Sequence, residues 1–223
     1  MKTFPEALIF DLNGTMINDM EYHINVWTEI LNSDLRAGLS PAQVRSNMYG
    51  KNSELLVRVF GADRFTPEEM EHWSLEKEKR YQQAFLPALK LIRGLDAFLK
   101  KAFDARIPMA IGSAAIPFNI DFVLDNLHIR KYFSAIVSAA DVRFSKPHPE
   151  TFTRAASLLG VDPSQCLLFE DAPKGVEAGD RAGMSAVVLT TMHSREEFLQ
   201  YTNVLHFISD YTDPYVLNLF DEL

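Results

Sequence analysis

The sequence contains little cysteine, no excess of basic residues and no long apolar run. Its single cysteine, Cys166, cannot form an intramolecular disulfide, and the apolar run C-L-L-F favours a buried structural thiol over a nucleophile. No run of about 18 apolar residues occurs, and the stretch M-K-T-F-P-E-A-L-I-F-D lacks the apolar segment of a signal peptide. We therefore expect a soluble protein of the reducing cytoplasm.

The charge balance excludes two classes of partner. The chain has 22 Lys+Arg and 30 Asp+Glu, which gives a net charge of −8. Nucleic acids and anionic membranes are bound by basic surfaces, so we expect neither. With 223 residues, 47% of them hydrophobic, the chain can form one large domain or a core with a smaller insertion. We expect a monomer or a weak dimer.

Short apolar runs alternate with amphipathic patterns over most of the chain. Residues at helical spacing lie between the runs, for example Leu95, Phe98, Leu99 and Ala102. Alternating strands and helices predict an α/β core with a mostly parallel sheet covered on both faces. The runs that we interpret as strands are 7–10, 107–112, 135–139, 166–169, 186–189 and 205–208.

Residues 16–87 break this alternation. They contain no good strand, only helical patterns, of which the longest runs from Pro67 to about Phe85. Thr66 is a predicted N-cap, and the charge-rich stretch E-E-M-E-H-W-S-L-E-K-E-K-R predicts a solvated helix face. We therefore predict a core of residues 1–15 and 88–223, interrupted by an all-helical unit of residues 16–87.

Polar residues follow four of the predicted strands. Asp11 follows the first strand, Ser113 the second, Lys146 the third, and Glu170 and Asp171 the fourth. Each residue alone is typical of a turn, a cap or a surface loop. In open parallel sheets, ligands bind beyond the carboxyl ends of the strands. We therefore expect these side chains to converge at one edge of the sheet.

Three carboxylates, a hydroxyl and an ammonium group suit phosphoryl transfer. Asp11 and Asp171 offer the hard oxygen ligands that Mg²⁺ prefers. The metal would offset the phosphate charge and let Asp11 attack phosphorus, forming an aspartyl-phosphate. Ser113, predicted to begin a helix, and the amides after it would hold phosphate oxygens. Lys146 would neutralise the remaining charge and anchor the nucleophile.

Four ordered motifs resemble those of the haloacid dehalogenase-like superfamily, most closely its β-phosphoglucomutase-like branch. They are L-I-F-D-L-N-G-T, A-I-G-S-A, S-K-P-H-P-E-T-F and L-L-F-E-D-A-P-K-G-V-E-A-G-D-R-A-G-M, and the resemblance covers nearly the whole chain. It implies a three-layer Rossmann-like core, a β-hairpin flap after the first strand, and a helical cap at residues 16–87.

The resemblance also implies a role for each motif residue. Asp11 would be the nucleophile, Asp171 a metal ligand supported by Glu170, and Ser113 and Lys146 phosphate ligands. The backbone carbonyl of residue 13 would complete the metal site. The remaining motif residues predicted to contact the substrate are Gly14, Thr15 and Ala114.

Position 13 departs from the pattern of this branch, in which an aspartate protonates the leaving oxygen and then deprotonates the attacking water. Here it is Asn13. An amide cannot shuttle a proton at neutral pH, and losing an acid/base costs roughly 10²–10⁴-fold. We predict intact metal and phosphate binding with slow turnover. Asn-Gly is also a turn signal, and this asparagine could deamidate and regenerate an aspartate.

Three explanations of Asn13 stay open. It can be an introduced substitution that holds a ligand or an intermediate. It can be native, with the proton supplied by Asp19, Glu21 or His23, or with a leaving group that needs none. It can also mark a protein that has lost catalysis and binds its ligand only.

The cap should supply the contacts to the leaving group. The stretch M-Y-G-K-N-S-E (48–54) falls where the family has its specificity loop, with Gly50 for a tight turn and Lys51 as a cation. His23 matches a histidine associated with the mutases, although packing or exposed roles stay open for it and for Lys51. β-Phosphoglucomutases usually carry an arginine and a lysine where Ser53 and Tyr49 stand, which favours a monophosphate hydrolase here.

Two other groups of enzymes in the superfamily also lack an aspartate at the position of Asn13. Dehalogenases carry a tyrosine there and need no magnesium, and the pair Glu170-Asp171 argues against them. Phosphonoacetaldehyde hydrolases use a cap lysine as a Schiff base, but Lys51 lies two places early. We therefore expect a Mg²⁺-dependent phosphohydrolase acting on a small phosphorylated metabolite, with a sugar phosphate first among the candidates. The alternatives are β-phosphoglucomutase and a non-catalytic phosphometabolite-binding protein.

Overall fold

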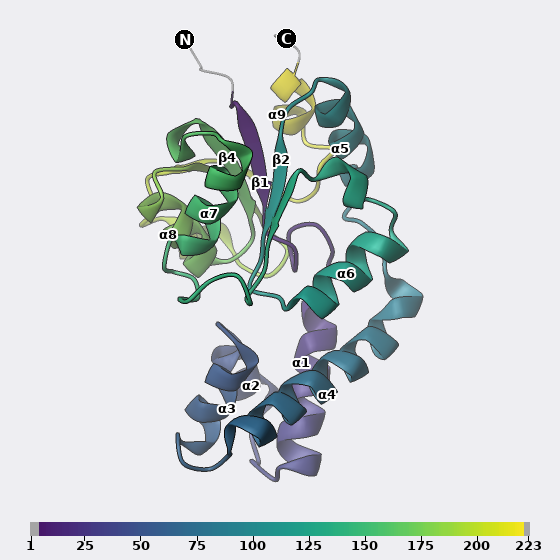
Figure 1. Ribbon diagram of the computed structural model, residues 1–223, viewed down its shortest axis with the longest axis vertical. Coiled ribbons are helices and arrows are strands. Elements are labelled where there is room, and N and C mark those ends of the chain that lie inside the picture. Colours follow the sequence, from purple (N-terminus) through teal and green to yellow (C-terminus); the bar gives the residue numbers. More distant parts are fainter. Residues whose placement is uncertain (1–4, 221–223) are drawn as a thin grey trace. The chain divides into compact units, whose positions relative to one another are not determined.

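The computed structural model describes residues 5–220, which form two compact units (Figure 1). The first, which we call the core, runs through Asn18 and resumes at Lys90. The second, which we call the cap, is Asp19–Leu89. The chain thus leaves the core once and returns to it once.

The ends of the cap differ from the predicted range 16–87. The carbonyl of Met16 accepts a hydrogen bond from the N–H of Ile92 at 2.8 Å, and Ile17 forms an isolated β-bridge with Leu91. These bonds pair the first residues after the turn that follows the first strand with the chain that returns from the cap. The residues therefore belong to the core, and the helical unit begins later than the composition indicates.

The core contains a parallel sheet with the strand order β3-β2-β1-β4-β5-β6. This is a doubly wound order, in which ligands bind where the order reverses. Each predicted apolar run corresponds to one strand, with ends that differ by at most two residues. The strands are β1 (Ala7–Phe10), β2 (Met109–Gly112), β3 (Ala135–Val137), β4 (Cys166–Glu170), β5 (Ser185–Leu189) and β6 (Val204–Ile208).

Helices cover both faces of this sheet, which confirms the predicted α/β fold. Figure 1 shows α7 and α8 on one face and α5 and α6 on the other. A short helix, α9 (Pro214–Leu217), lies near the end of the described chain. The longer helices are α5 (Leu95–Asp104), α6 (Pro117–Asn126), α7 (Glu150–Leu159) and α8 (Pro173–Arg181).

Burial on both faces explains why the strands are continuous apolar runs. Ile9 packs in a cluster with Phe152 of α7, while the next residue, Phe10, stacks on Phe169 with ring centroids 4.9 Å apart. Phe98 of α5 meets the Phe10 ring edge-on at 6.2 Å. Each fully buried phenylalanine contributes about 1.5–3 kcal/mol of hydrophobic stabilisation. These contacts pack the central strands of the sheet firmly against the helices on both faces.

The cap consists of helices, as predicted, and the longest of them lies at the predicted position. They are α1 (Met20–Glu29), which continues into a π-helical turn (Ile30–Asp34), α2 (Pro41–Asn47), α3 (Asn52–Phe60) and α4 (Pro67–Phe85). The predicted N-cap of α4 is confirmed. The hydroxyl of Thr66 accepts the N–H of Glu69 at 3.2 Å, and the carboxylate of Glu69 accepts the N–H of Thr66 at 2.9 Å. This capping box satisfies two backbone donors that a helix start leaves without intrahelical partners.

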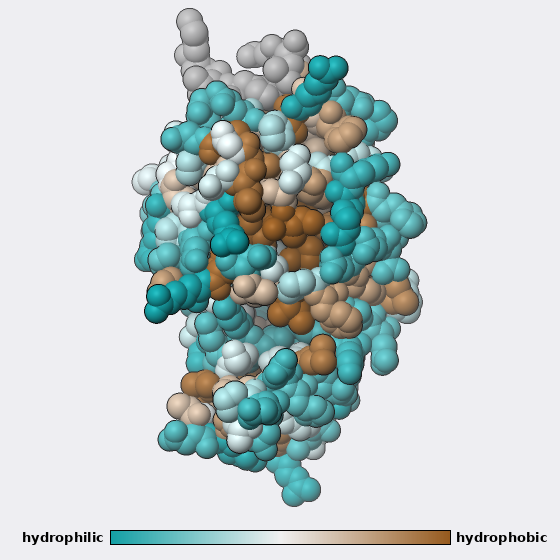
Figure 2. Space-filling view, in the orientation of Figure 1, coloured by the Kyte–Doolittle hydropathy of each residue, from teal (hydrophilic) through white to brown (hydrophobic). Residues whose placement is uncertain are grey.

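The surface of the molecule is mixed in polarity. Figure 2 shows hydrophilic residues over much of one face, with apolar residues between them. Among residues 5–220, no helix is long and apolar enough to cross a bilayer. The only cysteine, Cys166, is buried, and burial raises the pKa of its thiol to about 11. This confirms that the thiol of Cys166 is buried, as the apolar run predicts.

Candidate active site

Lys146 holds two of the predicted carboxylates together. Its Nζ donates to Oδ1 of Asp11 at 2.7 Å and to Oε1 of Glu170 at 2.8 Å. All three side chains are at least nine-tenths buried. Burial alone would lower the pKa of Lys146, but Asp11 and Glu170 outweigh it and raise that pKa. Lys146 therefore stays an ammonium at neutral pH and offsets part of the local negative charge.

The order of the sheet explains why these groups meet. β1 and β4 are neighbours, and the N–H of Asp11 continues their pairing by donating to the carbonyl of Phe169 at 2.9 Å. Glu170 is the last residue of β4, and its Oε2 accepts the N–H groups of Asp171 at 2.7 Å and Ala172 at 2.6 Å. Glu170 thus fixes the turn that carries Asp171 as well as contacting Lys146.

The site has the composition of a magnesium site. Asp11, Glu170 and Asp171 offer carboxylate oxygens that all lie within 4.8 Å of one another. Burial, and then the charges of Glu170 and Asp11, raise the pKa of Asp171 well above its usual range. The hydroxyl of Thr15 donates to Oδ1 of Asp171 at 3.2 Å. Buried negative charge on oxygen-only donors is what a hard divalent cation would offset, so these residues fit Mg²⁺.

Two glycines leave room for the carboxylates. A Cβ on Gly14, whose φ is +81°, would lie 2.1 Å from Oδ2 of Asp171. A Cβ on Gly175, within α8, would lie 1.7 Å from Oε1 of Glu170. Neither distance is compatible with a side chain. Gly14 was among the predicted site residues, whereas Gly175 was not, although a glycine inside a helical pattern is itself a signal of close packing.

Asn13 lies in the turn that follows β1. The N–H of Gly14 donates to the carbonyl of Ile17 at 2.8 Å, and the hydroxyl of Thr191 donates to the carbonyl of Gly14 at 2.7 Å. In the described chain around this turn, Asn13 and Ile17 form an isolated bridge in place of the implied β-hairpin flap. The flap expectation is wrong here because Ile17 also pairs with Leu91, in the segment that follows the cap, and the bridge to Asn13 is not extended into a hairpin. The Asn-Gly pair does form a turn, as expected.

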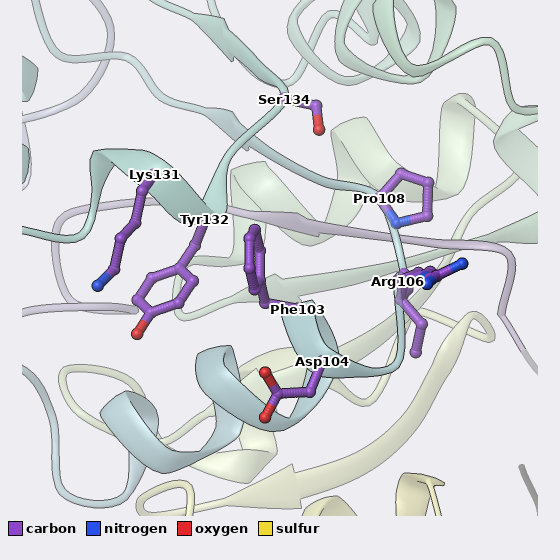
Figure 3. A pocket seen from close by; sticks show the side chains of 8 residues that line it. Phe103, Asp104, Arg106, Pro108, Lys131, Tyr132 and Ser134 are labelled. Carbon is purple, nitrogen blue, oxygen red and sulfur yellow. The ribbon is translucent and has the colours of Figure 1, made fainter.

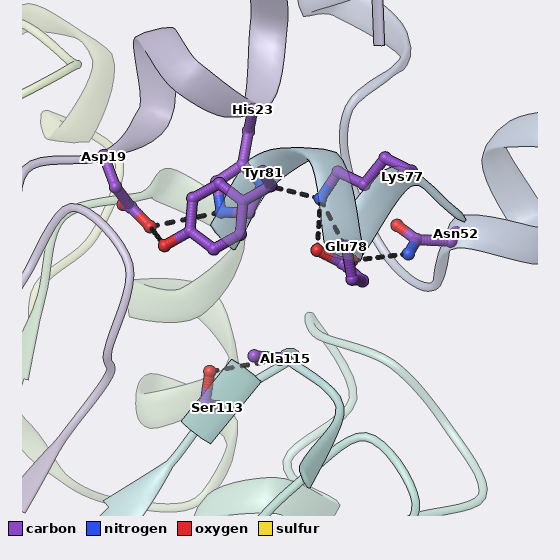
Figure 4. A network of polar contacts seen from close by, with 8 residues as sticks. All are labelled: Asp19, His23, Asn52, Lys77, Glu78, Tyr81, Ser113 and Ala115. Atoms are coloured by element: carbon purple, nitrogen blue, oxygen red, sulfur yellow. Dashed lines mark hydrogen bonds and ion pairs between the residues drawn. The ribbon is translucent and has the colours of Figure 1, made fainter. Parts of the chain in front are cut away.

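Ser113 follows β2 and is buried, but the prediction that it begins a helix is wrong. Its N–H donates to the carbonyl of Val137 at 2.9 Å, and its hydroxyl accepts the N–H of Ala115 at 3.1 Å (Figure 4). The helix starts at Pro117, because the fixed φ of proline suits a first helical position. Ser113 and the neighbouring Ala114 therefore lie in a turn that precedes the helix.

In the cap, the predicted specificity loop contains a turn at Gly50, whose φ is +72°. Lys51 precedes α3 as its N-cap residue. The sequence did not reveal the role of Arg58, whose guanidinium donates to the carbonyls of Asn47, at 2.6 Å, and Tyr49. The same group lies 3.7 Å from the centroid of the Tyr49 ring. Arg58 therefore fixes the backbone of this loop.

The charged face of α4 is not fully solvated, contrary to the prediction. Lys77 and Glu78 are only 3% and 4% exposed. The Nζ of Lys77 lies 2.9 and 3.0 Å from the two oxygens of Glu78 and 2.6 Å from Nδ1 of His23 (Figure 4). Oε1 of Glu78 also accepts from Nδ2 of Asn52 at 2.6 Å. Buried charges of this kind persist because each has a partner.

Asp19 completes this buried network in the cap. Its Oδ2 accepts from Oη of Tyr81 at 2.5 Å and lies 3.1 Å from Nε2 of His23. The rings of His23 and Tyr81 stack with centroids 3.8 Å apart. Lys77 and Tyr81, like Asp19 and His23, are four residues apart on one helical face, a spacing that could have indicated the network from the sequence.

A shallow pocket lies elsewhere on the core, with a volume of about 510 Å³ (Figure 3). It is lined by residues that include Phe103, Arg106, Pro108, Tyr132 and Ser134. Pro108 precedes β2 and Ser134 precedes β3, so the pocket lies at the amino ends of these strands. Asp11 and Ser113 follow the carboxyl ends of parallel strands, so the pocket is separate from the candidate active site.

The comparison with known families decides the identity. A family described as haloacid dehalogenase-like hydrolase matches residues 8–189. The chain belongs to this family. The match confirms the resemblance that the four motifs indicate.

Relatives of this haloacid dehalogenase-like hydrolase include phosphatases and a phosphomutase. The chain is 30% identical over 186 residues to fructose-1-phosphate phosphatase YqaB of Escherichia coli (strain K12), covering 81% of this chain and 94% of the relative. It is 30% identical over 187 residues to β-phosphoglucomutase of Bacillus subtilis (strain 168), covering 82% of each chain.

The fold matches a solved structure of the same branch. β-Phosphoglucomutase from Clostridium difficile superposes with a TM-score of 0.83 and 25% identity, covering 98% of each chain. The chain is therefore a β-phosphoglucomutase-like member of an enzyme family, with the Rossmann-like α/β fold of that branch.

Proposed function

We propose that this haloacid dehalogenase-like hydrolase is a Mg²⁺-dependent phosphohydrolase that forms an aspartyl-phosphate on Asp11. The observation that carries the proposal is the buried contact of Lys146 with Asp11 and Glu170, beside Asp171. A nucleophilic carboxylate, a cation that orients it and a cluster of further carboxylates are the parts that this reaction needs. The two relatives named above favour a sugar phosphate as the substrate.

We infer the metal ligands from this cluster together with the resemblance to the family. Asp11, Asp171 and the backbone carbonyl of Asn13 would hold Mg²⁺, with Glu170 supporting this shell. When bound, Mg²⁺ would offset the charge of the transferring phosphoryl group. Hydrogen bonds from Thr15 to Asp171, and from the Asp171 N–H to Glu170, keep these carboxylates oriented.

The chain's own residues perform the phosphoryl transfer. Lys146 holds Oδ1 of Asp11, which leaves the carboxylate oriented for attack on phosphorus. Ser113 and Ala114, in the turn after β2, and the ammonium of Lys146 bind the non-bridging phosphate oxygens. Asn13 cannot give or take a proton, so turnover is slower than with an aspartate at this position.

We assign the leaving group to a second set of residues. In the core we assign Gly14 and Thr15 to it, and in the cap Gly50 and Lys51, while His23, whose ring nitrogens contact Asp19 and Lys77, acts through those contacts. The cation of Lys51 suits a hydroxyl or a phosphate oxygen. The turn at Gly50, supported by the bonds of Arg58 to the loop carbonyls, presents Lys51 from a fixed backbone.

The loop favours a hydrolase over the β-phosphoglucomutase alternative. A mutase must hold a second phosphate, and Lys51 is the only basic residue among residues 48–54. Arg58, the next basic residue in the chain, uses its guanidinium on the carbonyls of Asn47 and Tyr49. A loop with one basic residue fits a monophosphate better than a bisphosphate.

Phosphate release from a panel of sugar and nucleoside monophosphates tests the proposal. Each substrate is assayed with Mg²⁺ and with a chelator, for this chain and for the variants Asn13→Asp and Asp11→Asn. We expect Mg²⁺-dependent release that Asn13→Asp accelerates by roughly 10²–10⁴-fold and Asp11→Asn abolishes. Glucose 6-phosphate formation from β-glucose 1-phosphate, primed with glucose 1,6-bisphosphate, is measured in parallel to detect a mutase.

Three other outcomes would change the assignment. Isomerisation faster than hydrolysis would identify a mutase. Tight binding of phosphate esters without turnover, even with an aspartate at position 13, would identify a binding protein. Release that persists in Asp11→Asn would exclude the aspartyl-phosphate.

A further inference from the structure

The turn that follows β1 is held partly by its own backbone and partly by side chains from elsewhere in the core. The N–H groups of Met16 and Ile17 donate to the carbonyl of Leu12 at 2.8 and 3.3 Å. The N–H of Gly14 donates to the carbonyl of Ile17 at 2.8 Å. The carbonyls of Gly14 and Thr15, by contrast, are bonded by side chains from distant parts of the sequence.

Two hydroxyl groups supply these bonds. The hydroxyl of Thr191 donates to the carbonyl of Gly14 at 2.7 Å, and the hydroxyl of Tyr211 donates to the carbonyl of Thr15 at 3.1 Å. Thr191 follows β5 and Tyr211 follows β6. Both residues therefore reach the carboxyl edge of the sheet, where parallel strands place their ligand-binding groups. The last two strands of the sheet thus carry the groups that hold this turn.

The two residues held in this way both lie against Asp171. A Cβ on Gly14 would be 2.1 Å from Oδ2 of Asp171, so only a glycine leaves room for this oxygen. The hydroxyl of Thr15 donates to the other oxygen, Oδ1, at 3.2 Å. A displacement of either residue would therefore change the position that the Asp171 carboxylate can adopt.

The same turn orients the backbone carbonyl that we propose as a metal ligand. The peptide between Asn13 and Gly14 is trans, so its carbonyl points away from its N–H, which the carbonyl of Ile17 holds. Gly14 has a φ of +81° and, as a glycine, has wide conformational freedom. The bond from Thr191 to the carbonyl of Gly14 restricts this freedom on the other side of the residue.

Tyr211 is itself rigidly placed. It is fully buried, and its ring lies between those of Phe98 and Phe169, with centroids 5.6 Å from each. Burial raises the pKa of its phenol well above the usual range, and the charges of Asp11 and Asp171 raise it further. The phenol therefore keeps its proton at neutral pH and remains a donor to the turn.

We propose that Thr191 and Tyr211 are positioning residues that set the Mg²⁺ affinity of the active site, an inference that rests on the proposed function. Their hydroxyls hold the turn, and the turn keeps Asp171 and the carbonyl of Asn13 in place for the cation. Groups that orient metal ligands typically contribute 10–100-fold to metal affinity, because the ligands then need no rearrangement when the metal binds.

Titration calorimetry with Mg²⁺ on the full chain tests this role. Thr191→Val removes one hydroxyl with little change of shape, and Tyr211→Phe removes the other while keeping the buried ring. We expect each variant to raise the dissociation constant for Mg²⁺ by roughly 10-fold, the lower end of the range, because each leaves one of the two bonds intact. Phosphate release from the best substrate of the panel should then need correspondingly more Mg²⁺ to reach half of its maximal rate.

Two control variants separate the donated hydrogen bond from packing. Thr191→Ser retains the hydroxyl and should bind Mg²⁺ as tightly as the parent chain. Thr190→Val removes the neighbouring hydroxyl, which donates to the carbonyl of Ile208 at 3.3 Å, and should also leave Mg²⁺ affinity unchanged. Thermal denaturation without Mg²⁺ measures the stability of each variant. A purely structural role predicts a lower melting temperature for Thr191→Val and Tyr211→Phe, with the same dissociation constant for Mg²⁺ as the parent.

A parent-like dissociation constant for Mg²⁺ in both Thr191→Val and Tyr211→Phe would overturn the inference and leave the proposed function intact. An equal loss of affinity in Thr191→Ser or in Thr190→Val would also overturn it, because packing would then be the cause. If Tyr211→Phe does not fold, the threonine variants decide the question alone. A parent chain that neither binds Mg²⁺ nor releases phosphate would instead contradict the proposed function itself.

Discussion

Replacing Lys77 by methionine should destabilise the cap strongly. The ammonium of Lys77 is 2.9 Å from Glu78, and both residues are almost completely buried. Methionine is similar in length to the aliphatic part of lysine but carries no charge. Of the contacts described above, the buried Glu78 carboxylate then loses the cation and keeps the hydrogen bond from the neutral amide of Asn52. Removing one partner of a buried ion pair costs about 3–5 kcal/mol.

The double variant Lys77→Met/Glu78→Leu should behave in the opposite way. It removes both charges and fills the space with apolar atoms, a change that is often neutral or stabilising by about 1–4 kcal/mol. The matched exposed pair is Arg45–Glu21, with side chains 49% and 64% accessible. Its disruption by Arg45→Met should cost at most about 1 kcal/mol.

Tryptophan fluorescence reports on the cap alone, because the only two tryptophans, Trp27 and Trp73, both lie within it. Urea unfolding monitored by this signal gives the free energy of unfolding of each variant. A cost below about 1 kcal/mol for Lys77→Met would refute the reasoning, because the pair would then behave as an exposed one. A double variant as unstable as the single one would show that packing, and not the unpaired charge, determines the effect.

Three further outcomes follow from the described contacts. Mg²⁺ at 100 times its dissociation constant should stabilise the core by about 2.7 kcal/mol in thermal denaturation, and Asp171→Asn should remove most of this gain. Burial raises the pKa of Glu78, but the charges of Lys77 and His23 outweigh burial and lower this pKa below its value in the unfolded chain. The ionised Glu78 carboxylate therefore stabilises the cap above its unfolded-state pKa, and this stabilisation is lost as the pH falls through its folded-state pKa. Fluorescence should therefore show acid unfolding of the cap below about pH 4.5 that Glu78→Gln makes shallower. Finally, the N–H of Gly14 is donated to Ile17 and cannot readily attack the Asn13 side chain, so peptide mapping should find deamidation in the denatured chain and very little in the native one.

The convergence of Asp11, Lys146, Glu170 and Asp171 could be predicted because topology converts order in the sequence into position in space. Residues that follow parallel strands reach one edge of the sheet, so strand ends alone identify the candidates. The end of a strand does not indicate how the chain continues after it. The predicted start of the next helix, at Ser113, was therefore four residues too early. The proline four positions later was the better guide to this boundary.

The cap network could not be predicted from the charge pattern of α4. Burial of Lys77 depends on His23, which is 54 residues away in the sequence, and burial of Glu78 depends on Asn52, 26 residues away. A charged run shows which residues are polar but not which of them have buried partners. Residues four positions apart identify the faces of α1 and α4 that can form such contacts. Which residues of the two helices meet depends on tertiary packing.

The bridge between Ile17 and Leu91 also has a consequence for how this enzyme can be altered. It brings the two points at which the inserted unit leaves and rejoins the core next to each other. An insertion whose ends are adjacent can be exchanged for another of different length at little cost in loop-closure entropy. The junction therefore makes the cap a replaceable module. If the proposed function is correct, transplanting the equivalent segment of a relative between these two residues should change the substrate preference.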